Sequence, residues 1–188
     1  MKSARSFKVV RVLDDARIGM EGRLASDDHL AVKIWLRLLS CSTQIEQEIR
    51  TRLRQRFGTT LPRFDYLAQL ERHPAGLRMN ALSRYLMVTG GNVTGLTDQL
   101  VADGWVARSA DAEDRRSIRV GLTDEGRRQF ALMAAEHEAW LSELFEGFGA
   151  VHKDALYEML GRLRVHLAQK ESDALAEPAP RVAHPKGP

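Results

Sequence analysis

Residues 76–126, GLRMNALSRYLMVTGGNVTGLTDQLVADGWVARSADAEDRRSIRVGLTDEG, decide the fold of this chain. Apolar residues recur at helical spacing in two short segments, about 79–87 and 89–103, with a tight turn between them. Two short strand-like runs follow, and a polar, charged loop joins them. A helix pair with a basic hairpin beside it is typical of proteins that bind a DNA duplex. The stretch therefore predicts a helix-turn-helix followed by a hairpin wing.

Composition sets wide limits on the class of protein. The chain has 188 residues and a net charge of +3, and 44% of its residues are hydrophobic. This length allows one domain, or two small lobes that share a core. Mild basicity agrees with a nucleic-acid partner but does not require one. No apolar run is long enough to span a membrane, and the N-terminus lacks the apolar run of a signal peptide, so we expect a soluble, cytoplasmic protein.

Helical periodicity continues on both sides of the opening stretch. Over residues 29–57, apolar residues recur every three or four positions, from Leu30 and Ile34 to Ile49 and Leu53. A helix with its N-cap at Thr60 is expected to run to about residue 72. Beyond the hairpin, a helix capped by Thr123 and a final helix are expected. Burying the long apolar stripes at the two ends of the chain together, across a two-fold axis, predicts a homodimer.

The expected fold is mainly α-helical with a small β-hairpin wing. It combines a winged helix-turn-helix lobe with a helical dimerisation lobe built from the N- and C-terminal helices. The expected layout is an N-terminal arm at 1–28, a main domain at 29–170 and a disordered, proline-containing tail at 171–188. Within the main domain we expect the helix-turn-helix at about 79–103, the wing at about 105–122, and the dimerisation helices at about 29–57 and 123–170.

The chain resembles the MarR family of winged helix-turn-helix regulators. The resemblance is carried by LPRFDYLAQLERHPAGLRMNALSRYLMVTGGNVTGLTDQL at 61–100 and DRRSIRVGLTDEG at 114–126, and with the flanking helices it covers roughly 29–168. It implies a homodimer that binds double-stranded DNA at a pseudo-palindromic operator. It also implies a transcriptional regulator, a repressor released by a small-molecule effector, although activators share this architecture. No cofactor and no enzymatic activity are expected.

The second helix of the pair is expected to read bases. Small residues at its start let the backbone approach DNA closely, and an asparagine can pair with adenine through two hydrogen bonds. Arginines on the preceding helix are expected to contact phosphates, which position a protein without reading sequence. The candidate DNA contacts before the wing are Arg78, Ser83, Arg84, Thr89, Gly90, Gly91, Asn92, Thr94, Gly95 and Asp98.

The loop of the hairpin carries acidic and basic residues together. Asp111 and Asp114 are expected near its tip, where carboxylates alone would repel phosphate. The resemblance implies that Asp114 pairs with Arg116 and stiffens the wing. It also implies that Arg115 or Arg116 reaches the minor groove, whose negative potential favours arginine.

An effector site is implied between the dimerisation helices and the DNA-binding lobe. Trp35 and Phe64 are candidates for its walls, although both also suit core packing. The stretch LMVTGGNVTGL resembles regulators of aromatic-acid breakdown, some of which sense CoA thioesters. An effector of this kind, an aromatic acid or its CoA thioester, needs cationic partners; the candidates are Arg23, Lys33 and Arg37.

Two alternatives stay open. Cys41, the single cysteine, could make the protein a redox-responsive regulator, but its place on the apolar stripe predicts a small buried hydrophobe. The other alternative is an interaction module whose wing no longer binds DNA. The six histidines are scattered, so no metal site is expected.

Overall fold

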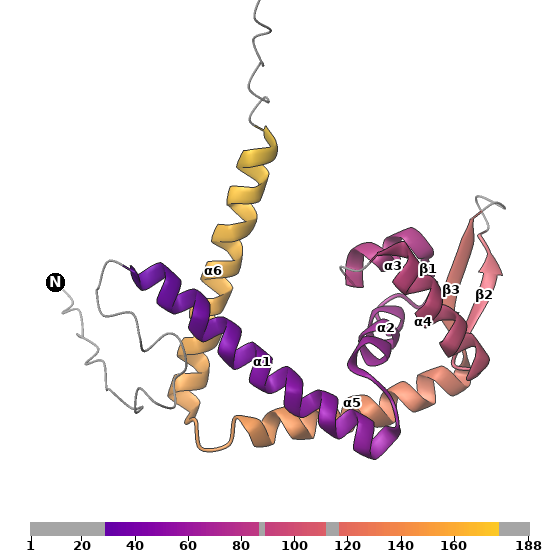
Figure 1. Cartoon of the computed structure of the whole chain (residues 1–188), viewed down its shortest axis with the longest axis horizontal. Helices are drawn as coiled ribbons and strands as arrows, with labels where there is room; N and C mark the ends of the chain where they lie inside the picture. Colours follow the sequence, from indigo (N-terminus) through magenta and orange to yellow (C-terminus); the bar gives the residue numbers. More distant parts are fainter. Residues whose placement is uncertain (1–28, 87–88, 112–116, 177–188) are drawn as a thin grey trace, which may run out of the picture. The chain divides into compact units, whose positions relative to one another are not determined.

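The computed structural model of the protein describes residues 29–86, 89–111 and 117–176. The chain divides into two compact units, Met1–Trp140 and Leu141–Pro188. The fold is mainly helical with a small antiparallel sheet, as the sequence predicts (Figure 1). Its elements are α1 (Leu30–Phe57), α2 (Leu61–Glu71), β1 (Leu77–Arg78), α3 (Met79–Leu86), α4 (Gly90–Ala102), β2 (Val106–Ala110), β3 (Ile118–Leu122), α5 (Asp124–Leu144) and α6 (Ala150–Ala176).

The core of the first unit forms where α2, α3 and α4 meet. Apolar side chains from all three helices are fully or almost fully buried: Leu67, Leu70, Leu82, Val93 and Leu100. One polar pair lies among them, because the Tyr66 hydroxyl on α2 is 2.6 Å from Thr97 Oγ1 on α4. Thr97 Oγ1 in turn donates to the carbonyl of Val93 at 2.7 Å, so the buried hydroxyls satisfy one another. This contact fixes α4 against α2.

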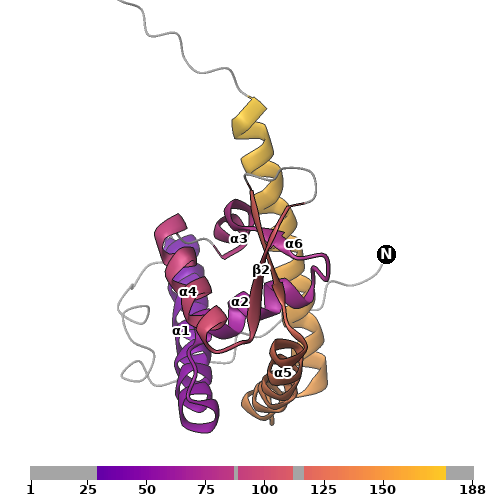
Figure 2. The same ribbon diagram turned by 90° about the vertical axis from the view of Figure 1, so that its right-hand side faces the viewer.

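The sheet has three strands in the order β1-β3-β2, all antiparallel. β2 and β3 form the expected hairpin, which runs beside α2 and α3 in the view of Figure 2. β1 was not expected, because two residues are too short to show the alternation of a strand. Val120 in the central strand is fully buried, opposite Leu77 of β1, so the third strand joins the hairpin to the helix that follows β1.

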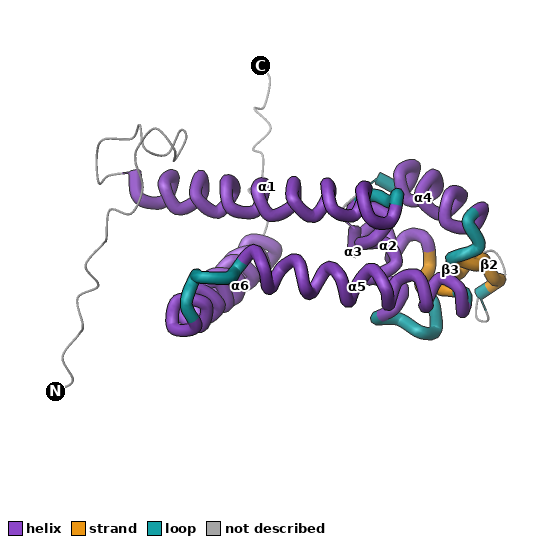
Figure 3. The backbone as a smooth tube through the Cα atoms, turned by 90° about the horizontal axis from the view of Figure 1, so that it is seen from below, coloured by secondary structure: helices purple, strands orange, loops and turns teal. Residues whose placement is uncertain are grey.

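The chain leaves the wing where β3 gives way to α5 (Figure 3). A tight junction there brings Thr123 and Gly126 against the turn at Gly104 and Trp105. Thr123 Oγ1 accepts a hydrogen bond from the Gly126 amide at 2.9 Å, which confirms Thr123 as the helix cap. The same hydroxyl donates to the Gly104 carbonyl at 2.7 Å. A Cβ on Gly126 would lie 1.9 Å from the Trp105 carbonyl oxygen, so only glycine fits there.

The ends of the last two helices differ from the expectation. α5 ends at Leu144 rather than near 148, and the turn after it contains Gly147 and Gly149 at positive φ. α6 continues to Ala176, past the expected start of the disordered tail at 171. Residues 171–176, ESDALA, contain no proline or glycine, and the first proline of the tail is at 178. The arm at 1–28 and residues 177–188 lie outside the described residues.

The apolar stripe of α1 is buried only near its C-terminal end. Ile49 and Leu53 are buried, whereas Leu30 and Trp35 are largely exposed. Cys41 is exposed as well in the single chain, so the expected burial of this residue requires a partner for the stripe. The physical reason is that the stripe continues beyond the part of α1 that packs in the single chain. α6 also exposes large apolar side chains: Val151, Leu156, Tyr157, Met159, Leu160, Val165 and Leu167.

The junction gives a direct test of the fold. We expect Gly126→Ala to lower the free energy of unfolding by more than about 3 kcal/mol, since its Cβ would overlap a backbone carbonyl. Gly161→Ala on α6 is the matched control, because an added Cβ there meets no atom within 4 Å. That substitution should raise stability by about 0.5–1 kcal/mol through helix propensity. Urea unfolding of both variants checks this; equal effects would contradict the close contact at Gly126.

Candidate DNA-binding interface

The exposed face of α4 is small and uncharged apart from one acid. Val93, Thr97 and Leu100 face the core. The opposite face exposes the residues predicted to meet DNA, namely Gly90, Gly91, Asn92, Thr94, Gly95 and Asp98. α4 contains no lysine or arginine, and Asp98 forms an ion pair with Arg108 of β2. The helix predicted to read bases therefore brings no positive charge of its own.

The start of α4 differs in detail from the expectation. Thr89 occupies the N-cap position with an extended backbone, but its side chain makes no capping hydrogen bond. Its carbonyl accepts a bond from the Val93 amide, and Thr94 Oγ1 bonds back to the Gly90 carbonyl. The first amides of a helix have no partner within the helix. Without a side-chain cap from Thr89, those of α4 suit a ligand oxygen.

The glycines of α4 have no role in the packing of the chain. None of Gly90, Gly91 and Gly95 has a positive φ, and a Cβ added at any of them would meet nothing within 4 Å. Glycine inside a helix costs about 1 kcal/mol relative to alanine. The packing of the chain therefore does not require these glycines.

α3 places two predicted phosphate contacts beside α4. Arg84 is exposed in the last turn of α3. Ser83 is partly buried, and its hydroxyl donates to the Asn80 carbonyl within the same helix at 3.0 Å. Arg84 is therefore well placed to reach solvent and a ligand, whereas Ser83 already has a local partner.

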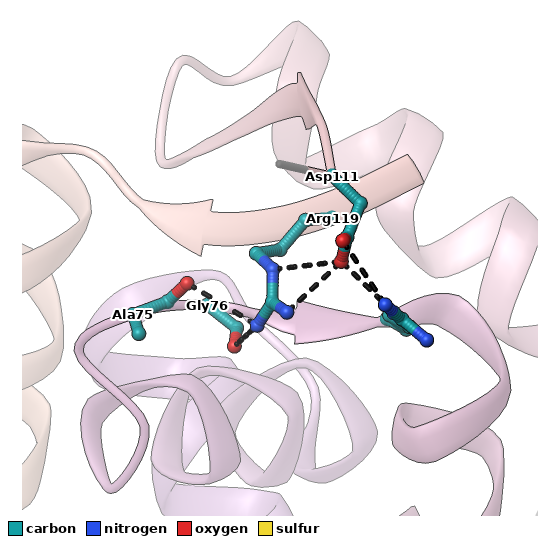
Figure 4. Close-up of polar contacts among 5 residues, drawn as sticks. Ala75, Gly76, Asp111 and Arg119 are labelled. Atoms are coloured by element: carbon teal, nitrogen blue, oxygen red, sulfur yellow. Dashed lines mark hydrogen bonds and ion pairs between the residues drawn. The ribbon is translucent and has the colours of Figure 1, made fainter. Parts of the chain in front are cut away.

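The base of the wing holds a cluster of three charged side chains, Arg78, Asp111 and Arg119, which we call the wing-root cluster. Figure 4 shows Asp111 and Arg119 of this cluster. The expectation of Asp111 at an exposed tip was wrong, because it directly follows the last residue of β2 and its side chain is fully buried. Arg78 Nε and Nη2 donate to its two oxygens at 2.8 and 3.0 Å. Arg119 Nε donates to Oδ2 at 3.1 Å. Asp111 is buried because two strands each supply an arginine to it.

This cluster changes the account of the predicted wing residues. Arg78, predicted to touch phosphate, is bonded to Asp111 in the free protein. Arg119 did not stand out in the sequence, where it lies on the opposite side of β3 from Ile118 and Val120. An arginine between two apolar positions of a strand, near an acid across the hairpin, was the available signal. Asp114, Arg115 and Arg116 lie outside the described residues, so their pairing stays a prediction.

The candidate effector residues differ in their exposure. Trp35 and Arg37 are exposed on α1, whereas Phe64 is buried on α2. A hollow of about 450 Å³ in the first unit is lined by other residues, Arg52, Gln55, Arg56 and Trp140. In the part of the chain that the structure describes, no group of three or more candidate ligands could hold a metal ion. None of the described helices has the length and hydropathy of a membrane span.

Comparison with known proteins places the chain among transcriptional regulators. A model of the MarR family matches residues 57–117. The transcriptional activatory protein BadR of Rhodopseudomonas palustris is 32% identical over 120 residues, which are 63% of this chain and 68% of BadR. The transcriptional repressor YetL of Bacillus subtilis is 35% identical over 82 residues, 44% of this chain and 49% of YetL. A MarR family regulator from Silicibacter pomeroyi matches with a TM-score of 0.64 and 31% identity, over 77% of this chain and 99% of that one.

Phe64, one of the predicted effector-wall residues, packs against a titratable group. Its ring centroid lies 4.9 Å from that of His137 and 5.5 Å from that of Phe130, both on α5. Burial lowers the pKa of His137 below its ordinary value, because the charged imidazolium loses solvation among these rings. The neutral imidazole is therefore the form that the fold favours.

This environment predicts a pH-dependent contribution to stability. The unfolded chain binds the His137 proton more tightly than the folded chain, so the contribution is present above about pH 6.5, the ordinary pKa of histidine. It is lost as the pH falls through the lower, folded pKa. His137→Gln removes this titration, and we expect wild-type stability to fall relative to the variant on acidification below about pH 6.5. If the free energies of unfolding of the two proteins changed in parallel from neutral to acid pH, this prediction would be contradicted.

Proposed function

The chain belongs to the MarR family of DNA-binding transcriptional regulators, and on that premise we propose that it binds, as a homodimer, a pseudo-palindromic operator in double-stranded DNA. The members found by comparison are regulators of transcription and not enzymes. The chain spans between about half and two thirds of the length of the two regulators compared above. The operator, the effector and the cytoplasmic location are accordingly part of the proposal.

The exposed glycine face of α4 is the observation that carries the proposal. Glycines with open space around them lower helix stability and add nothing to the core. They do allow another surface to come within contact distance of the helix backbone. Asn92 lies on the same face and can recognise adenine through two hydrogen bonds in the major groove. We infer that α4 reads the operator through backbone approach and Asn92.

Positive charge beside α4 supplies the affinity in this proposal. Arg84 on α3 is exposed next to the reading face, and Arg115 and Arg116 follow the end of β2 in the sequence. Arginines at such places contact phosphates or enter the minor groove. Because phosphate contacts release bound cations, DNA binding should weaken steeply with salt.

A second copy of the chain is the proposed cover for the exposed apolar stripes. In the first unit, Leu30, Ile34 and Trp35 of α1 are exposed, and in the second unit α6 exposes an apolar series of its own. A soluble protein rarely leaves contiguous apolar surface of this kind in water. Dimers are typical of the MarR family, and a two-fold axis would pair two reading helices with the two half-sites of an operator.

The direction of regulation is proposed as repression. BadR is named an activatory protein and YetL a repressor, so the family relationship alone does not decide between the two signs. A small-molecule effector is typical of the family. The aromatic acid or CoA thioester proposed here is supported by the resemblance of residues 86–96, with Trp35, Phe64 and Arg37 as the proposed contacts.

Two substitutions test the separate roles proposed for Arg84 and Asn92 in DNA binding. We expect Arg84→Ala to weaken binding to all sequences alike and to reduce the slope of log affinity against log salt by about one. Asn92→Ala should cost about 1–3 kcal/mol at the operator and relax base preference at one position in each half-site. Gel shifts on the DNA upstream of the gene, over a salt series, measure both effects. Sedimentation of each variant verifies the dimer.

If a folded dimeric wild-type protein gave no shift at low salt, the DNA-binding proposal would be wrong and the interaction-module alternative would be favoured.

The effector proposal has its own experiment. Aromatic acids and their CoA thioesters, titrated into the protein–DNA complex, should release the DNA, and Arg37→Ala should raise the concentration of a CoA thioester needed for release. Peroxide forms a separate arm of the experiment, because Cys41 is exposed. Release by peroxide in wild type but not in Cys41→Ser would favour the redox alternative. Release by none of the aromatic compounds would exclude the aromatic effector.

A further inference from the structure

We propose that Asp111 is a positioning residue for DNA recognition. Through the wing-root cluster it fixes the wing relative to the helix-turn-helix, and it thereby sets how well the protein distinguishes its operator from other DNA, without touching DNA itself. This inference rests on the proposed function as a DNA-binding regulator.

The cluster joins every strand of the sheet. Arg78 is the last residue of β1, Asp111 follows the last residue of β2, and Arg119 lies in β3. α3 begins at Met79, directly after Arg78. The Asp111 carboxylate therefore connects the strands of the wing to Arg78, and through Arg78 to α3, the first helix of the helix-turn-helix.

Arg119 extends the connection to the turn before β1. Its Nη1 donates to the Gly76 carbonyl at 2.8 Å, while its Nε and Nη2 hold Asp111 (Figure 4). Gly76 has a φ of 74°, and a Cβ there would lie 2.6 Å from the Val120 carbonyl oxygen. The turn is thus pressed against β3, and the guanidinium of Arg119 spans the gap between this turn and the end of β2.

The burial of the carboxylate makes it the centre of the cluster. The Asp111 side chain is 0% exposed, whereas those of Arg78 and Arg119 are 36% and 31% exposed. A fully buried carboxylate requires donors to each oxygen, and both oxygens of Asp111 have them. The partly exposed arginines, by contrast, can be solvated in other positions. Loss of the carboxylate would release both arginines from a common position.

The wing loop, residues 112–116, is flanked by Asp111 of this cluster and by Ser117. The Asp111 amide donates to the Ser117 carbonyl at 3.0 Å, so the two residues that flank 112–116 are tied to each other. The sequence between them contains Arg115 and Arg116, the proposed minor-groove residues. A recognition group must be held within about 0.5 Å of its working geometry by the residues around it. Asp111 is the buried residue in position to do this for the wing.

Positioning and simple attraction predict opposite changes when Asp111 loses its charge. The cluster carries two positive charges and one negative charge. Removing the negative charge leaves more positive charge at the root of the wing, which favours any DNA. The looser wing, however, favours the operator less. Affinity for unrelated DNA should therefore hold or rise while discrimination falls, whereas a purely structural role would weaken binding to the operator and to unrelated DNA alike.

The experiment compares Asp111→Asn, Arg119→Lys and a control in the full-length protein. Asp111→Asn keeps the shape and removes the charge, whereas Arg119→Lys keeps the charge and removes the planar, multiply bonded contact. Glu136→Gln is the matched control. It removes one carboxylate bonded to an arginine, Arg56, between α1 and α5, and so makes the same change in net charge away from the wing. Circular dichroism and sedimentation report folding and dimerisation.

The probes are a duplex selected by the wild-type protein from a random library and a scrambled duplex of the same length. We expect Asp111→Asn to lower the ratio of the two affinities at least tenfold, with unchanged or tighter binding of the scrambled duplex. The slope of log affinity against log salt should steepen by up to about one. Arg119→Lys should lower the ratio by a similar factor without a steeper slope, and Glu136→Gln should stay within about twofold of wild type.

The inference would be overturned if the ratio of affinities for the selected and scrambled duplexes stayed within twofold of wild type in both Asp111→Asn and Arg119→Lys. It would also be overturned if these variants bound both duplexes more weakly by the same factor. If Asp111→Asn fails to fold, Arg119→Lys decides by the same criteria. A wild-type protein that selects no preferred duplex would overturn the proposed function itself, which is a different result from a selective wild type whose variants remain selective.

Discussion

α4, the proposed reading helix, depends on its packing against α2. Its sequence begins with two glycines and contains a third at Gly95, so its intrinsic helix propensity is low. Stability comes instead from the buried face, where Val93 and Leu100 enter the core and Thr97 shares a hydrogen bond with Tyr66. Most helices in proteins gain their stability from such tertiary contacts. Because the buried face alone stabilises α4, its opposite face is not needed for packing.

The outward face of α4 and the arginines around it determine the electrostatics of the candidate DNA-binding interface. The outward face carries no cation, and the nearest acid, Asp98, is paired with Arg108. The described arginines near the wing are likewise held by acids, as Arg78 and Arg119 are by Asp111. The arrangement suits a protein that must bind one DNA sequence better than others. Held arginines act at defined positions, whereas unrestrained ones attract every phosphate.

Much of the fold was predictable from the sequence because its signals are local. Apolar residues at helical spacing indicated each long helix, Gly58 ended α1 in the left-handed conformation, and Thr123 capped α5. The errors occurred where local signals were weak. β1 has only two residues, α5 ended several residues early, and α6 continued into a segment without helix breakers. The candidate DNA-facing positions on α4 were placed by periodicity alone, and their exposure agrees with it.

The sequence by itself determined the order of the helices and of the hairpin, the helix-turn-helix with its wing, and the small face of α4 without a cation. It did so because helix periodicity, caps and turns act over a few residues. Only the tertiary structure decided the state of the charged side chains and of Cys41. Asp111 lies 33 residues from Arg78 along the chain, yet sheet pairing brings them within 2.8 Å. The carboxylate of Asp111, which had been expected at an exposed tip, is instead buried at the base of the wing as the shared partner of two arginines. Pairings across that distance depend on the register of three strands, which no local pattern specifies.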